Sequence, residues 1–164
     1  LFGLAFGLSG LVGMLTFGVL SDRAARRDPA GPLRLAGWAL GAATLLILVV
    51  TWSPSLGPAR WLAIPCGLLG GGWSIGVVAA LQYVLPDRIR VTGTALAMLV
   101  VNLLGYVVGP WLAGALSDAV GGDATHSLRL GLTLVIPLGF VGAVLIRRAG
   151  RTIAEDRRSL EALG

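Results

Sequence analysis

The sequence predicts an all-α polytopic membrane protein, and three observations carry this prediction. Hydrophobic residues make up 55% of the 164 residues, and the mean hydropathy is +0.85, which is more apolar than a water-soluble domain of this size requires. Only 13% of the residues are charged, and they cluster between long apolar runs. None of these runs alternates polar with apolar residues as barrel strands do, so we expect helices.

Five apolar runs are long enough, at roughly 20 residues or more, to cross about 30 Å of hydrocarbon as helices. They cover residues 1–20, 33–52, 61–85, 91–116 and 128–146, so that 1–149 is the membrane part. Residues 150–164 follow as a tail. The segments between the runs are rich in Pro, Gly, Asp and Ser, as turns require.

The arginines predict the orientation of these helices. All basic residues are arginine, and all but Arg60 and Arg129 fall in three groups beside the ends of apolar runs. The groups are Arg23, Arg26, Arg27 and Arg34; Arg88 and Arg90; and Arg147, Arg148, Arg151, Arg157 and Arg158. The positive-inside rule then places these groups and the tail in the cytoplasm and residue 1 outside. Because the charge lies at helix ends, we interpret the net charge of +5 as a topology signal and expect no nucleic-acid partner.

Residues that could carry catalysis are sparse. Cys66 is the single cysteine and lies within an apolar run, and His126 lies in an expected outer loop. No carboxylate falls in the centre of a membrane run. We therefore expect no enzyme activity, no cofactor and no metal site. These runs also offer no intramembrane titratable group for proton coupling.

The run at residues 70–76 is rich in glycine. It lacks the Lys-Ser/Thr ending of a phosphate-binding loop and lies in mid-membrane. Small residues spaced four apart instead favour close packing against neighbouring helices: Gly67 with Gly71, and Gly72 with Gly76 and Ala80.

A weak internal repeat relates residues 13–22 to residues 109–118. Both copies end in Leu-Ser-Asp, and one is expected to end inside and the other outside. This pattern is typical of the inverted three-helix repeats of secondary transporters, although chance matches in so biased a composition are a competing explanation.

The string GVLSDRAARRD resembles the signature G-x-x-x-D-R/K-x-G-R-R/K of the major facilitator superfamily. The matching residues are Gly18, Asp22, Arg23, Arg26 and Arg27, and Ala25 stands where the signature has glycine. The superfamily carries this signature after its second and eighth helices, and only four apolar runs follow it here. The resemblance thus implies helices eight to twelve of a twelve-helix fold, most of its C-terminal lobe. Helix seven and the N-terminal lobe are expected to be missing from this fragment.

A second resemblance is to bacterial members of the spinster-like branch. It rests on residues of the fourth run and its flanks: Pro86, Arg88, Arg90, Asn102, Gly105, Gly109, Pro110, Gly114, Ser117, Asp118, Ser127, Leu128 and Arg129. This branch uses alternating access, and its animal members export lysolipids and related amphiphiles. The resemblance implies a bacterial inner-membrane location.

The expected function is secondary active transport of a small amphiphilic or lipid-like organic solute by alternating access. Asp22 and the arginines after it would make a contact that exists in only one state, or they would only fix topology. The alternatives are a non-transporting assembly subunit, a membrane-embedded enzyme, and a permease subunit driven by a separate ATPase. Expected partners are the lipid bilayer, the substrate and the N-terminal lobe of the same chain.

The expected substrate cavity follows from family analogy, which places the third and fourth runs beside the transport path. Polar groups there are costly unless they face protein, water or substrate. The candidates are Trp73, Ser74, Gln82, Tyr83, Asn102 and Tyr106. Alternatively, Asn102 bridges helices and Tyr83 anchors the inner interface. Gly105, Gly109, Pro110 and Gly114 are expected to allow packing or a kink.

Overall fold

A computed structural model describes residues 2–121, 123–153, 155 and 158–159. These residues form helices joined by short turns, and no strand occurs among them. In chain order the elements are α1 (Phe2–Arg27), α2 (Gly31–Thr51), α3 (Leu56–Val84), α4 (Arg90–Leu103), the π-helical segment η1 (Leu104–Val108), α5 (Gly109–Val120), α6 (Ala124–Val135) and α7 (Leu138–Ala149).

Five stretches of helix are long and apolar enough to span a membrane. They are Gly3–Arg27, Gly31–Thr51, Gly57–Val84, Arg90–Val120 and Thr125–Ala149. The fourth joins α4, η1 and α5, and the fifth joins α6 and α7. The all-α polytopic class predicted from composition is therefore confirmed.

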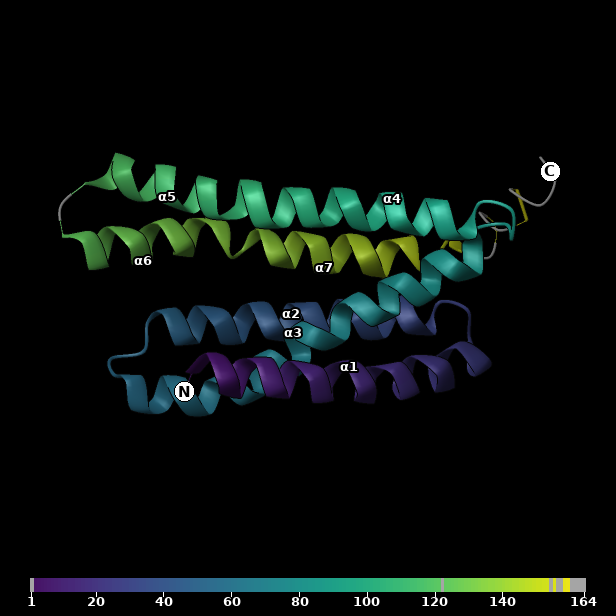
Figure 1. Ribbon diagram of the computed structural model, residues 1–164, viewed down its shortest axis with the longest axis horizontal. Coiled ribbons are helices and arrows are strands. Elements are labelled where there is room, and N and C mark those ends of the chain that lie inside the picture. Colours follow the sequence, from purple (N-terminus) through teal and green to yellow (C-terminus); the bar gives the residue numbers. More distant parts are fainter. Residues whose placement is uncertain (1, 122, 154, 156–157, 160–164) are drawn as a thin grey trace.

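Two prolines account for the irregularities within the fourth and fifth spans. Pro110 has no N–H group to donate to the preceding turn, and the helix just before it widens into η1, where the Gly109 amide bonds to the Leu104 carbonyl. Pro137 also lacks an N–H group, and here the helix is interrupted: α6 ends at Val135 and α7 begins at Leu138. Both spans continue past the break in nearly the same direction (Figure 1).

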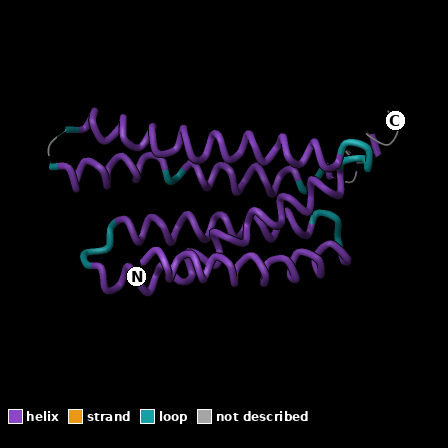
Figure 2. Tube along the Cα trace, in the orientation of Figure 1, coloured by secondary structure: helices purple, strands orange, loops and turns teal. Residues whose placement is uncertain are grey.

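The helices form two groups, one of α1 and α2 and the other of α4 to α7, and α3 runs between them (Figure 1). α3 packs against both α1 and α2, α2 packs against α7, and α5 packs against α6. Figure 1 shows α3 running diagonally from the group of α1 and α2 toward the start of α4, and Figure 2 shows how short the connecting turns are. Unlike these helices, α4 and η1 contain no buried residue. They lie at one side of the bundle and have few contacts with other helices of this chain.

Helix boundaries differ from those expected at several ends. α1 continues through Arg27, so the expected loop after residue 20 is helical over its first seven residues. α3 begins at Leu56 and α5 ends at Val120, in both cases within expected loops. The apolar run marks only the part of a helix in hydrocarbon, whereas alanine and arginine extend the helix beyond it.

The segment after α7 turns back against the bundle. Ile153 is 4% exposed and packs with Leu33 and Ala80, next to Tyr83 and Val84. Arg157, which belongs to the third arginine group, lies outside the described residues.

Candidate functional site

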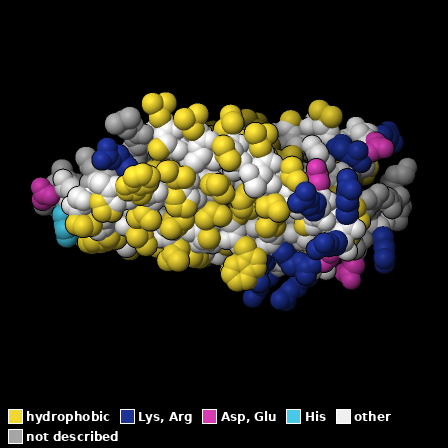
Figure 3. All heavy atoms as spheres, turned by 90° about the horizontal axis from the view of Figure 1, so that it is seen from below, with side chains coloured by type: hydrophobic (Ala, Val, Ile, Leu, Met, Phe, Trp, Pro, Cys, Tyr) yellow, Lys and Arg dark blue, Asp and Glu magenta, His cyan; other side chains and the backbone are white. Residues whose placement is uncertain are grey.

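Basic side chains gather at one end of the bundle. This end combines the C-terminal turn of α1, the α1–α2 turn, the α3–α4 turn and the C-terminal turn of α7 (Figures 1 and 3). Hydrophobic side chains cover the middle of the face shown in Figure 3. The described residues therefore have the charge asymmetry from which the sequence predicted the orientation.

The signature residues lie on the last turns of α1. Gly18 is partly buried and faces open space, since nothing lies within 4 Å of where a Cβ would stand. Asp22 and the signature arginines (Arg23, Arg26 and Arg27) are exposed. No ion pair joins Asp22 to a basic side chain among the described residues. Its carboxylate is therefore presented to the outside of this chain, on a helix rather than on the loop that the sequence suggested.

A second acidic residue, Asp28, organises the turn that follows. Its Oδ1 accepts a hydrogen bond from the Ala30 amide at 2.9 Å, and its Oδ2 pairs with Arg34. Gly31 then lies so close to the Ala24 carbonyl that a Cβ would be 2.7 Å from its oxygen. The sequence analysis missed Asp28, although an Asp before Pro is a common signal for a turn.

The two copies of the internal repeat lie on α1 and α5. These helices run in opposite directions in Figure 1, so Asp22 and Asp118 lie at opposite ends of the bundle. The serines before them differ in their surroundings. Ser21 is buried and its hydroxyl has no hydrogen-bond partner among the described residues, whereas the Ser117 hydroxyl bonds to Ser127 at 3.2 Å.

Glycines on α3 bring its backbone against α1. Gly71 faces the carbonyl of Gly10, and Gly67 faces Ser9 and the carbonyl of Phe6. A Cβ at Gly67 or Gly71 would collide with α1. The predicted packing role of these two glycines is confirmed.

The second set of small residues contacts both neighbours of α3. The space beside Gly72 is filled by the ring of Phe17, and Gly76 faces the Pro32 carbonyl and the Ala36 methyl group. Ala80 belongs to the buried cluster with Leu33 and Ile153. The predicted small-residue interface is confirmed here too, and it extends from α1 to α2.

The four α3 candidates for substrate contact do not share one face. Trp73 and Gln82 are nine residues apart, about two and a half turns, so they point to opposite sides of a regular helix. Gln82 is exposed and Trp73 partly buried. The Ser74 hydroxyl donates to the Gly71 carbonyl at 3.2 Å, and Tyr83 packs against the cluster around Leu33.

The candidates on the fourth span are exposed. Asn102 lies on α4 and Tyr106, 80% exposed, on η1. A Cβ at Gly105, Gly109 or Gly114 would meet nothing within 4 Å. Together with Pro110 these glycines surround the π-helical segment, and they contact no other helix of the described chain at their Cβ positions.

Two hollows occur near the basic end, and none of the six predicted cavity residues lines either one. One, of about 300 Å³, is lined by apolar side chains of α2, α3, α7 and Ile153. The other, of about 760 Å³, is lined by Asp28 and four arginines. No group of three or more His, Cys, Asp or Glu side chains suited to a metal occurs in the described part of the chain.

Comparison with known proteins gives a consistent result, although no family model matches the chain. It is 29% identical to protein spinster homolog 3 of Danio rerio, over 99% of this chain and 34% of the relative. It is 34% identical to an MFS-type efflux pump of Mycolicibacterium smegmatis, over 96% of this chain and 38% of the relative. It is 31% identical to a sphingosine-1-phosphate transporter of Xenopus tropicalis, over 99% of this chain and 34% of the relative.

The resemblance to the major facilitator superfamily is confirmed. The spinster-like resemblance, which the sequence analysis based on one span and its flanks, extends over nearly the whole chain. The chain spans about a third of the length of these curated relatives. The part of this chain that matches the relatives includes Gly18–Arg27 and the five helices that are long and apolar enough to span a membrane.

Proposed function

We propose that this chain forms part of a secondary active transporter that moves a small amphiphilic or lipid-like organic solute by alternating access. The observation that carries the proposal is similarity over nearly the whole chain to proteins named as an efflux pump and a sphingosine-1-phosphate transporter. The five helices long enough to span a membrane agree with this function.

Within such a transporter, the five spans would be helices eight to twelve of the C-terminal lobe. Relatives about three times as long as the matched segment support the presence of a further lobe. The exposed side of α4, η1 and α5 offers a surface on which further helices could pack. The basic end of the bundle would face the cytoplasm of a bacterium, with the tail on that side of the inner membrane.

Asp22 would act in the conformational change. A carboxylate at the membrane face can dock on the positive N-terminus of a helix in the other lobe, with Arg23, Arg26 and Arg27 orienting it. Its exposure and its freedom from ion pairs in the described chain support a partner outside this segment. A contact made in one state and broken in the other would bias the alternation.

The substrate class rests on the chemistry of the candidate side chains and on the relatives. Trp73 can pack against an apolar substrate, and Asn102 can hydrogen-bond to a polar head. The path would lie between α3 and α4 of this segment and the other lobe, because transporter sites form at the interface of repeats. If the path lies there, Asn102 and Tyr106 should be exposed within this chain, as they are.

Catalysis is the weaker alternative. The described residues hold no group of three or more His, Cys, Asp or Glu side chains suited to a metal, and two of the relatives are named as an efflux pump and a transporter. A non-transporting assembly subunit would give no role to an unpaired Asp22 on the last turns of α1.

The test is reconstitution of the full-length protein into liposomes loaded with a fluorescent lysophospholipid, with a labelled sugar as the comparison solute. We expect saturable, protein-dependent movement of the lysophospholipid and none of the sugar. Movement that is the same with and without an ion gradient across the liposome membrane, or no movement of any amphiphile by correctly inserted protein, would contradict the proposal.

A further inference from the structure

The larger hollow at the basic end has the composition of an anion site. Its lining includes Arg34 of α2, Arg147 and Arg148 of α7, and Arg151 just after α7, with Asp28 as the carboxylate. Asp28 is paired with Arg34. No carboxylate among the described residues pairs with the other three arginines. The hollow therefore has an excess of positive charge that nothing in the described chain neutralises.

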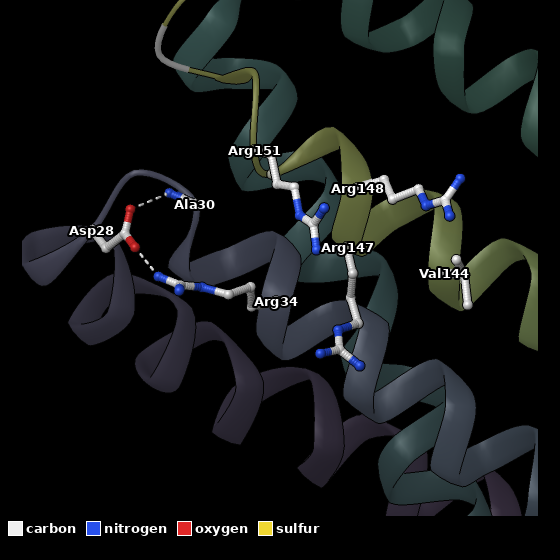
Figure 4. A pocket seen from close by; sticks show the side chains of 8 residues that line it. Asp28, Ala30, Arg34, Val144, Arg147, Arg148 and Arg151 are labelled. Carbon is white, nitrogen blue, oxygen red and sulfur yellow. Dashed lines mark hydrogen bonds and ion pairs between the residues drawn. The ribbon is translucent and has the colours of Figure 1, made fainter.

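The arrangement of α7 concentrates these charges on one side. Val144, Arg147 and Arg148 are spaced three and four residues apart, which places them on one face of α7, and Arg151 follows in the turn after the helix. The opposite face carries Ile146, which packs on the cluster around Leu33. Figure 4 shows Arg147 and Arg151 extending toward α2, near the Asp28–Arg34 pair.

Arg147 is held in place by two features of α2. Gly37 has no side chain, and the aliphatic part of Arg147 occupies the space where its Cβ would stand. The guanidinium carbon then lies 4.4 Å from the centroid of the Trp38 ring, a cation–π contact. A guanidinium fixed in this way keeps N–H donors available for a phosphate, and arginine binds phosphate in a bidentate geometry.

Apolar surface continues from the hollow along both helices. Trp38 is 64% exposed and Val144 50% exposed, and Leu45 and Val141 are exposed one or two turns further into the membrane span. The hollow thus lies where the headgroup region would meet hydrocarbon, as indole rings favour. A soluble anion would use only the arginines, whereas a phospholipid would also cover the apolar strip.

We propose that this hollow binds the phosphate headgroup of an anionic phospholipid, with its acyl chains along the exposed faces of α2 and α7. Its volume of about 760 Å³ is sufficient for a headgroup. Basic pockets between membrane helices at the cytoplasmic surface are suited to such lipids. The proposal does not depend on transport, because it concerns a lipid bound at the rim of the bundle.

The test uses the full-length protein in a neutral detergent with equimolar dioleoyl phosphatidylglycerol and dioleoyl phosphatidylcholine. Native mass spectrometry then measures how many molecules of each lipid remain bound to the protein. We expect preferential retention of phosphatidylglycerol. Arg147→Gln and Arg151→Gln should each reduce it about fivefold. Arg88→Gln is the matched control, because Arg88 is an exposed arginine at the same end that does not line the hollow.

Three results would overturn the proposal: equal retention of both lipids, an equal loss in Arg88→Gln, or displacement of the phosphatidylglycerol by millimolar inorganic phosphate. The last result would indicate a site for a soluble anion. If Arg147→Gln fails to fold because the contact with Trp38 is lost, Arg151→Gln decides the question alone, since Arg151 makes no such contact in the structure.

Discussion

The indole Nε1 of Trp52 donates a hydrogen bond to the Thr133 hydroxyl at 2.9 Å, joining the end of α2 to α6. The same hydroxyl donates to the Arg129 carbonyl at 2.7 Å. Arg129 in turn donates to the Ser53 carbonyl at 3.4 Å. These bonds connect two helical groups at the end opposite the arginine-lined hollow.

Trp52→Phe should destabilise the protein by about 1 kcal/mol, because the Thr133 hydroxyl loses its donor while an aromatic ring is kept at this position. The measurement is the thermal unfolding midpoint in detergent. Trp61→Phe is the control, since Trp61 is 76% exposed and should tolerate the change. Equal shifts in the two variants would show that the hydrogen bond contributes nothing measurable.

Gly71→Ala should destabilise the protein by about 1–3 kcal/mol, because the added methyl group would push against the backbone of Gly10. Gly7→Ala is the control, since nothing lies within 4 Å of its Cβ position. Folded yield and unfolding midpoint measure the effect. A Gly71→Ala variant as stable as Gly7→Ala would mean that α1 and α3 can separate without cost.

Single cysteines test the orientation. Ile89→Cys in the α3–α4 turn and Thr125→Cys near the start of α6 are both exposed and lie at opposite ends. In a Cys66→Ala background, a membrane-impermeant thiol reagent applied to intact cells should label position 125 and not position 89. The reverse pattern would place the arginines outside.

Asp22→Asn should reduce transport at least tenfold with little loss of folded protein, because the exposed carboxylate makes no ion pair that stabilises the described chain. Asp118→Asn is the matched control, since Asp118 ends the second repeat copy and is also exposed. Transport rate and protein abundance are measured together. A parallel fall in both quantities would favour a role in topology alone.

Trp73→Ala and Asn102→Ala should each weaken substrate affinity, by about tenfold if the lost contact is worth about 1.4 kcal/mol. The measurement is the concentration dependence of lysophospholipid transport, in variants that reach the membrane at normal levels. Trp61→Phe is the control, because Trp61 is not among the six candidates and is 76% exposed, and the affinity of this variant should be unchanged. Unchanged affinity in both alanine variants would remove these residues from the site.

Hydropathy and residue size were sufficient to predict most of the architecture. The five membrane-spanning stretches follow from apolar length, and the role of Gly67 and Gly71 follows from their spacing. Both are local patterns. The helical continuation of α1 through Asp22 was missed because charge marks the membrane boundary and not the end of a helix.

Contacts between distant residues could not be predicted in this way. Trp52 and Thr133 are 81 residues apart, and no local pattern relates them. The stacking of Arg147 on Trp38 depends on the close approach of α2 and α7 at Gly37. The candidate cavity is even harder to predict, because its residues point in different directions and line neither of the two hollows described above.

The glycine contacts between α1 and α3 have a mechanical consequence. Where a backbone lies directly against a carbonyl, no side-chain rotamer can change to relieve the contact. We therefore expect α1 and α3 to resist sliding past each other and to move as a rigid unit. Bending is easier where packing is sparse, at the five-residue turn between Val84 and Arg90 and along the α4 segment beyond it. We therefore expect that a displacement of the last turns of α1 would move α3 with it and would change the angle between α3 and α4.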